Sequence, residues 1–189
     1  FNDSELDGLF AATPPLEALR LLLSWAATDG SAHPGGTGQG RMQKSLLIAD
    51  VSRAFFEAPA RRDLCVELPE EALAAGETTQ EVVGKLKASL YGTRDASMNW
   101  QEEVAKCMMQ WGFEICKYNP CLFRHQGKQM LCLVHGDDFV SSGDAANLNW
   151  LKEKLRQRFE IKSKTVGLNE GESREERILN RRFRVTEDG

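Results

Sequence analysis

The sequence predicts an α+β domain in which an antiparallel sheet carries its helices on one face. The first sign is an apolar run, Ser45–Val51, which has the length of a buried strand and holds a carboxylate near its end. The second is a pair of apolar runs within 130–142, separated by a tight turn. Helical spacing of apolar residues at 98–112 and 145–158, followed by a closing strand at 160–164, completes a βαββαβ order.

Size and composition are those of an ordinary globular chain. The 189 residues are enough for one sizeable core, and 41% hydrophobic with 28% charged residues is a usual balance. No apolar run approaches the roughly 20 residues of a membrane helix, so we expect no membrane partner. The chain has neither a signal peptide nor an initiator methionine, and we expect it to be part of a longer protein.

Cysteine use and charge give weaker signals. The five cysteines form no CxxC pair, which favours reduced and mostly buried thiols of an intracellular protein. The net charge of −4 does not favour a nucleic-acid partner. However, the stretches Lys152–Lys164 and Arg177–Arg184 are locally basic, and such a stretch is either a contact for phosphates or a solvated face.

The amino-terminal part is expected to contain one helix and one loop. Thr13 followed by two prolines indicates a helix start, and leucines at helical spacing extend the helix over 15–28. Residues 1–12 are weakly patterned. Five glycines and a proline within 30–40 predict a flexible loop.

The middle of the chain alternates between strand and helix signals. Segments 64–68 and 82–92 are strand-like and flank a polar excursion at 70–81. Ser97 is expected to cap the following helix, and Gly112 to end it.

Three short strands follow, with turns at 126–127 and 136–137, and Asp144 is expected to cap the last helix. The tail beyond Gly167 is highly charged and becomes strand-like at 178–185. We therefore expect an organisation in three parts: a lead-in at 1–40, a core at 41–167 and a charged segment at 168–189.

Three carboxylates are the candidate catalytic groups. Asp137 and Asp138 lie in the turn between the two middle strands, and in a βαββαβ unit the end of the first strand, with Asp50, lies beside that hairpin. Carboxylates this close repel one another and require a compensating cation. Oxygen ligands of this kind suit two Mg²⁺ ions about 3.5–4 Å apart, which serve chemistry on phosphates.

A structural interpretation of the same residues stays open at this point. Asp is a favoured turn residue, so an Asp-Asp pair in a turn is common without any catalytic role. An apolar strand that ends in Asp is often followed by a helix which that Asp caps. Only the combination of both features in βαββαβ order favours a two-metal site.

Five segments, in this order along the chain, resemble the motifs of copia-type retrotransposon reverse transcriptases, which are RNA-dependent DNA polymerases. They are ADVSRAFFEAP (49–59), KLKASLYGTRDASMNW (85–100), YNPCLF (118–123), LVHGDDFVSSG (133–143) and LKEKLRQRFEIKSKTVG (151–167). The resemblance runs from about Pro15 to Gly167, which is most of the chain.

The resemblance implies a polymerase palm with part of the fingers. It also implies synthesis of DNA from deoxynucleotides on an RNA or DNA template-primer, with two Mg²⁺ ions or Mn²⁺ in their place. The further partners would be the other domains of a Pol polyprotein, including integrase and ribonuclease H. The expected location is the cytoplasm, in a virus-like particle, or the nucleus.

Carried over by position, the resemblance also implies roles for single residues. Asp50 and Asp137 would bind both metals, Asp138 would complete the site, and the carbonyl of Val51 would add a ligand.

The remaining roles concern the nucleotide. Phe55 would lie under the sugar and select deoxynucleotides, and without the family it would be interpreted equally well as a core aromatic. Tyr91 and Gly92 would form a turn against the nucleotide and template, and Arg94 would reach a phosphate or remain a surface residue.

Lys162 or Lys164 would donate a proton to the leaving pyrophosphate as a general acid. The sequence also departs from the family, because His135-Gly136 stands where the family has Tyr-Val before the Asp pair. Two other functions remain: an inactive or domesticated copy that only binds nucleic acid or protein, and an unrelated two-metal phosphodiesterase.

Overall fold

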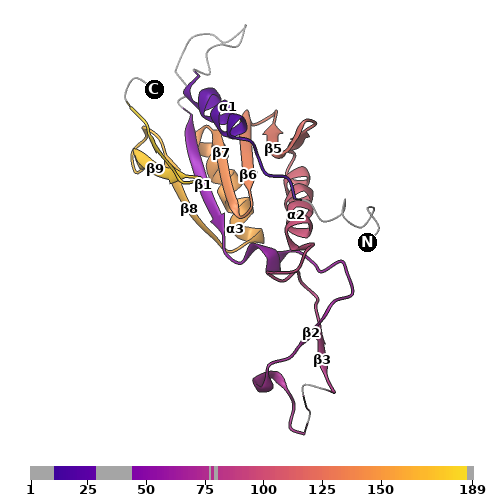
Figure 1. Ribbon diagram of the computed structural model, residues 1–189. Helices are drawn as coiled ribbons and strands as arrows, with labels where there is room; N and C mark the ends of the chain where they lie inside the picture. The colour runs from indigo at the N-terminus through magenta and orange to yellow at the C-terminus, as the bar shows by residue number, and fades with distance from the viewer. Residues whose placement is uncertain (1–10, 29–43, 77, 79–80, 187–189) are drawn as a thin grey trace. The chain divides into compact units, whose positions relative to one another are not determined.

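The computed structural model describes residues 11–28, 44–76, 78 and 81–186. The expected glycine-rich loop at 30–40 and most of the weakly patterned segment 1–12 lie outside these residues. The helices and strands in chain order (Figure 1) are α1 (Leu16–Ala27), β1 (Ser45–Val51), β2 (Cys65–Glu67), β3 (Val83–Lys85), α2 (Ala96–Gln110), β4 (Glu114–Cys116), β5 (Asn119–His125), β6 (Met130–His135), β7 (Asp138–Gly143), α3 (Ala145–Arg158), β8 (Ile161–Val166), β9 (Glu175–Ile178) and β10 (Arg181–Arg184).

The described residues form two compact units. One comprises residues 53–104, with the short 3-10 helices η4 (Ala54–Glu57) and η5 (Glu70–Ala72) and the β2–β3 ribbon. The other comprises the described parts of 12–52 and 105–189, with α1, a six-stranded sheet, α3 and the β9–β10 hairpin. Among the described residues, no helix has both the length and the apolar character to cross a membrane.

The six-stranded sheet has the order β4-β5-β6-β7-β1-β8, and every neighbouring pair is antiparallel. The chain is therefore a mixed α+β protein, as the sequence predicts. β1 lies between β7 and β8, although these strands are far apart in sequence, so the first strand is held on both edges by backbone hydrogen bonds.

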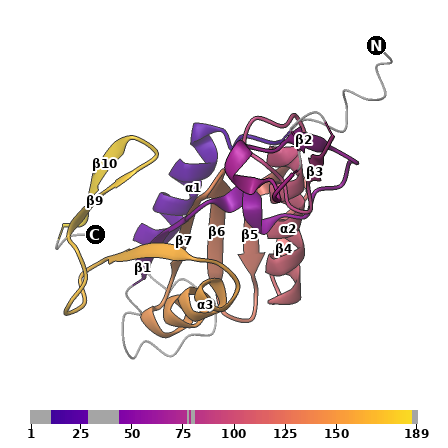
Figure 2. The same cartoon turned by 90° about the horizontal axis from the view of Figure 1, so that it is seen from below.

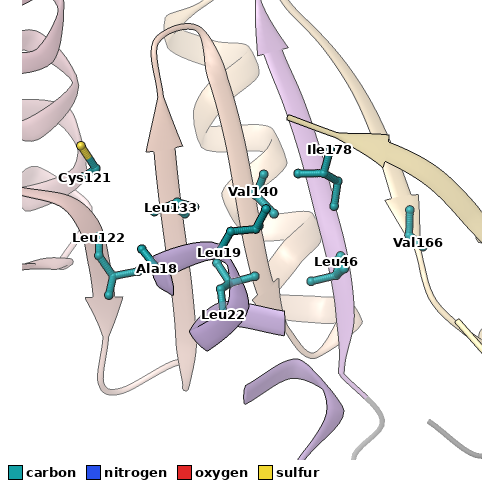
Figure 3. Packing of buried hydrophobic residues seen from close by; sticks show 10 residues of the cluster. All are labelled: Ala18, Leu19, Leu22, Leu46, Cys121, Leu122, Leu133, Val140, Val166 and Ile178. Atoms are coloured by element: carbon teal, nitrogen blue, oxygen red, sulfur yellow. The ribbon is translucent and has the colours of Figure 1, made fainter. Parts of the chain in front are cut away.

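Helices cover both faces of this sheet. Figure 2 shows α1 on one side of strands β1, β7 and β6 and α3 on the other. The expectation of helices on one face concerns the helices at 98–112 and 145–158, and α1 is an additional helix outside that βαββαβ unit. The leucines of α1 pack against residues of several strands, and Figure 3 shows the members of this cluster: Ala18, Leu19, Leu22, Leu46, Cys121, Leu122, Leu133, Val140, Val166 and Ile178.

Helix ends follow the sequence only in part. Asp144 caps α3, because its carboxylate accepts a hydrogen bond from the backbone N–H of Asn147 at 2.8 Å. Gly112 ends the second helix with a φ of +87°, as expected. Two expected caps are wrong. α1 begins after Pro15 without a side-chain cap, and Ser97 lies inside the first turn of α2.

The charged tail forms a hairpin instead of one strand. Leu179 and Asn180 adopt φ values of +45° and +65° and form the turn between β9 and β10. Two consecutive positive φ values belong to a type I′ turn, which favours Asn and Gly. Leucine at its first position hides this turn from a sequence-based prediction.

All five cysteines are free thiols, and three of them are buried, in agreement with the sequence. Burial raises the pKa of Cys132 to about 12. A thiol of this kind is chemically inert in the folded chain.

The cap of α3 gives a direct test of this part of the fold. We expect Asp144→Ala to lower the free energy of unfolding by about 1 kcal/mol, because one backbone donor of the first turn loses its acceptor. Urea denaturation measures the change. The control Gln157→Ala, at an exposed position of the same helix, should stay within about 0.5 kcal/mol of the wild type. Equal losses in both variants would argue against the cap.

Candidate active site

A row of four charged or polar side chains crosses the sheet at the end of β1. Asp50 lies directly opposite Asp138 of β7 on one side and opposite Lys162 of β8 on the other. His135 of β6 lies opposite Asp138 in turn. Residues directly opposite in antiparallel strands point to the same face, with Cβ atoms about 4.5–5.5 Å apart. We call His135, Asp138, Asp50 and Lys162 the cross-strand row.

Asp137 joins the end of this row through the hairpin turn. β6 and β7 are connected by two residues, Gly136 and Asp137, and Gly136 has a φ of +61°. A glycine with positive φ at the first loop position is typical of a type II′ turn. The carbonyl of Asp137 accepts a hydrogen bond from the backbone N–H of Val51 at 3.0 Å, which attaches the turn to the end of β1. The structure thus brings all three candidate carboxylates to one end of the sheet.

The electrostatics of Asp138 reflect this crowding. Partial burial raises the pKa of its carboxyl group, and the charges of Asp137 and Asp50 raise it further. The charge of His135 acts in the opposite direction. The carboxylates of Asp137 and Asp50 disfavour ionisation of Asp138. A bound cation would therefore be favourable at this site.

The carboxylate oxygens of this site suit a hard cation, although they do not form a complete coordination site. Within residues 11–28, 44–76, 78 and 81–186, no three His, Cys, Asp or Glu side chains are placed so that they could hold a metal ion. Mg²⁺ at phosphate-transfer sites uses only one or two protein carboxylates and takes its other oxygens from water and substrate phosphates. One or two of the carboxylates Asp50, Asp137 and Asp138 would supply the protein ligands of such an ion in chemistry and number.

The two candidate lysines differ in their surroundings. Lys162 belongs to the cross-strand row and faces Asp50. Lys164 is placed two residues further along β8, and its Nζ donates to Glu176 Oε2 of the tail hairpin at 2.6 Å. This hydrogen bond lowers the pKa of the Glu176 carboxyl group. Lys164 is therefore already engaged by a carboxylate.

The nucleotide-side candidates belong to the unit 53–104. The rings of Phe55 and Tyr91 are 4.5 Å apart and tilted by 33°, and the Tyr91 side is half exposed. Gly92 has a φ of +91°, which favours glycine, and Arg94 is exposed. The structure brings Phe55 and Tyr91 together, and the roles of all four residues stay predictions.

Two features of this region were missed in the sequence. The first is the position of His135 opposite Asp138, which could have been inferred from the two-residue turn at Gly136-Asp137. The buried polar residues Ser89, Asp95 and Asn99 gave no signal, because polar residues before a helix or in its first turn are normally interpreted as caps or surface.

Comparison with known proteins agrees with the family that the sequence motifs resemble. A family model described as reverse transcriptase (RNA-dependent DNA polymerase) matches residues 2–168. The chain is 24% identical over 162 residues to the retrovirus-related Pol polyprotein from transposon TNT 1-94 of Nicotiana tabacum, which covers 84% of this chain and 11% of that protein. It is 27% identical over 128 residues to the transposon Ty1-DR4 Gag-Pol polyprotein of Saccharomyces cerevisiae, which covers 67% of this chain and 7% of that protein.

The chain thus spans about a tenth or less of the length of these relatives. No solved structure matches it. The family model covers most of the chain, and the relatives are transposon Pol polyproteins. The chain therefore belongs to the reverse transcriptase (RNA-dependent DNA polymerase) family, as a copia-type domain.

Proposed function

We propose that this chain is the catalytic core of a retrotransposon reverse transcriptase that adds deoxynucleotides to the 3′-hydroxyl of a primer on an RNA or DNA template. The observation that carries the proposal is the register of β1 and β7, which sets Asp50 opposite Asp138, together with the bond that attaches the Asp137 turn to Val51. The other domains of the Pol polyprotein are the expected covalent partners.

The sheet topology supports a polymerase palm. Strands β6-β7-β1-β8 are neighbours in this order, and the chain visits them in the sequence β1, β6, β7, β8. With α2 after β1 and α3 after β7, this order matches the βαββαβ connection of the ferredoxin-like unit that we propose. Such a unit places the end of its first strand beside its middle hairpin, where the carboxylates lie.

The carboxylates are proposed to hold Mg²⁺, with Mn²⁺ as a substitute, through Asp50 and Asp137 and with Asp138 as the third member. The backbone of Val51, next to the Asp137 turn, is a further candidate oxygen ligand. When bound, two such ions lower the pKa of an attacking hydroxyl and neutralise charge on a leaving phosphate. Burial raises the pKa of Asp138, and the charges of Asp137 and Asp50 raise it further; this repulsion is the feature of the chain that favours cation binding.

Lys162 is the better candidate for the proton donor to pyrophosphate. It faces the carboxylates across β1 and β8, and its ammonium carries the proton that a leaving phosphate oxygen needs. Lys164 is less suited, because it would first have to leave Glu176.

Primer extension tests the proposed function. We expect the full-length protein to extend oligo(dT) on poly(rA) with Mg²⁺, and Asp137→Asn to reduce kcat at least about a thousandfold, since the substitution removes transition-state charge stabilisation. Asp63→Asn is the matched control, because Asp63 is an exposed carboxylate in the 53–104 unit, paired with Lys85. The control should keep wild-type activity.

Extension that survives Asp137→Asn would contradict the metal assignment. Absence of extension in the wild-type protein, with RNA binding retained, would favour a binding module over an enzyme.

The pKa of Asp138 predicts a pH-dependent stability. The pKa of Asp138 is higher in the folded than in the unfolded chain. The free energy of unfolding therefore falls as pH rises from the unfolded pKa to the folded pKa, and the loss is complete above both values. Without divalent ions, Asp138→Asn should therefore raise the free energy of unfolding at pH 7, by no more than about 1 kcal/mol because water screens the site. The gain should shrink as pH falls through the usual pKa of Asp and vanish about one pH unit below it, near pH 3. Urea denaturation in EDTA at both pH values measures this, and a gain independent of pH would refute the interpretation.

The role expected for Phe55 has its own test. We expect Phe55→Ala to lower the preference for deoxynucleotides over ribonucleotides about tenfold or more, because the ring would no longer exclude a 2′-hydroxyl. Competing incorporation of dTTP and UTP by the full-length protein measures the ratio. Phe56→Ala, which removes the neighbouring ring on the other contact with Tyr91, is the control. An equal effect of both substitutions would show that the ring pair acts only through packing.

A further inference from the structure

Three buried polar side chains gather at the start of α2, all within the unit 53–104. Ser89, Asp95 and Asn99 are 2%, 3% and 1% exposed. The amide Nδ2 of Asn99 donates to Ser89 Oγ at 3.0 Å and to Asp95 Oδ2 at 3.1 Å. Arg62 approaches the same Asp95 oxygen at 3.7 Å. We call Ser89, Asp95 and Asn99 the Asn99 network.

Through Ser89, this network attaches the segment that follows Phe55. The Ser89 N–H donates to the carbonyl of Ala58 at 2.8 Å, and its hydroxyl donates to the carbonyl of Pro59 at 3.3 Å. A hydroxyl has one proton, so Ser89 can accept from Asn99 while it donates to Pro59. Asn99 therefore fixes the orientation of the Ser89 hydroxyl.

Asn99 also lies next to the turn that contains Tyr91. Thr93 closes this turn, because its N–H and its hydroxyl both donate to the carbonyl of Leu90, at 3.1 and 2.8 Å. Ser89 precedes the turn and Asp95 follows it, so Asn99 contacts both of its ends. The rings of Phe55 and Tyr91, one on each of the two segments that Ser89 joins, are 4.5 Å apart.

The network is not what stability alone would select. Asp95 Oδ1 and Asn99 Oδ1 are buried and have no hydrogen-bond partner among the described residues. Buried polar groups with unpaired oxygens destabilise a fold relative to apolar residues of similar shape. Such violations are expected where a function requires a defined geometry.

We propose that Asn99 is a positioning residue for nucleotide binding, which through Ser89 and Asp95 holds the Tyr91 turn against Phe55. The inference rests on the proposed function, because it takes Phe55 and Tyr91 as the pair that meets the nucleotide. Tyr91 is 50% exposed, so its ring is available to a substrate while its position is set from the buried side. The network adds Ser89, Asp95 and Asn99 to the residues that determine this binding surface.

Fluorine NMR tests the positioning without any enzymatic activity. The chain has two tyrosines, Tyr91 and Tyr118, and Tyr118 is 89% exposed. In protein labelled with 3-fluorotyrosine we expect two resonances, of which the Tyr91 signal is displaced by the Phe55 ring. Asn99→Ala should move the Tyr91 signal towards that of Tyr118 and leave Tyr118 unchanged. An unmoved Tyr91 signal in a folded variant would overturn the proposal.

Two further variants provide a control and a second test. Asn147→Ala removes an amide with a similar set of hydrogen bonds in the other unit and should leave both signals in place. If it also moved the Tyr91 signal, the effect of Asn99→Ala would be non-specific and the proposal would fail. Ser89→Ala removes only the hydroxyl between Asn99 and Pro59 and should move the Tyr91 signal in the same direction. If Asn99→Ala does not fold, Ser89→Ala decides alone.

Kinetics separates positioning from a purely structural role. In the full-length protein, Asn99→Ala should raise KM for the deoxynucleotide about tenfold and leave kcat within about twofold, because binding and not chemistry is weakened. A lower melting temperature with an unchanged KM would overturn the proposal. If the wild-type protein extends no primer, the proposed function fails, whereas the fluorine experiment still decides whether Asn99 positions Tyr91.

Discussion

The antiparallel pairing of β1 with β7 is the constraint on which the candidate active site depends. It sets Asp50 opposite Asp138, where two like charges repel, and backbone hydrogen bonds on both edges of β1 keep the pair in place. The bond from Val51 to the Asp137 carbonyl adds the third carboxylate. A slip of one residue in this register would turn Asp50 to the opposite face of the sheet and separate it from Asp137 and Asp138.

The packing of the sheet explains how this repulsion is tolerated. The face that carries Asp50 also carries Leu46, which lies under the leucines of α1 at the other end of the strand. Apolar burial at one end of β1 thus holds the strand whose other end bears the charges. Lys162 flanks the carboxylates within the same cross-strand row and reduces the net negative charge without removing it.

The sequence was sufficient where local chemistry decides the structure. The apolar run of β1 and the Gly136-Asp137 turn predicted the strands, and the βαββαβ order predicted that Asp50 lies near the turn. It was insufficient where contacts between distant residues decide. β4 is only three residues long and pairs with β5 through an irregular register, so it carries no readable alternation. The turn at Leu179 uses a residue that rarely adopts positive φ.

The same limit applies to the candidate site. The carboxylates could be predicted because their chemistry is visible in single residues, and the strand order brings them together. The engagement of Lys164 by Glu176 depends on how the tail hairpin folds back on β8, and the Asn99 network is joined through Ser89 to Pro59, 30 residues away in sequence. Neither arrangement has a local sequence signal.

The most direct measurement of the central claim is the location of a bound divalent ion. Paramagnetic broadening of backbone amide signals by substoichiometric Mn²⁺ maps that location in the chain itself. The account predicts that the signals of Val51, Asp138 and their neighbours broaden first, because the ion binds where β1 meets the hairpin turn. Broadening confined to the exposed acidic residues Glu70 and Glu71, with the β1–β7 signals unaffected, would contradict it.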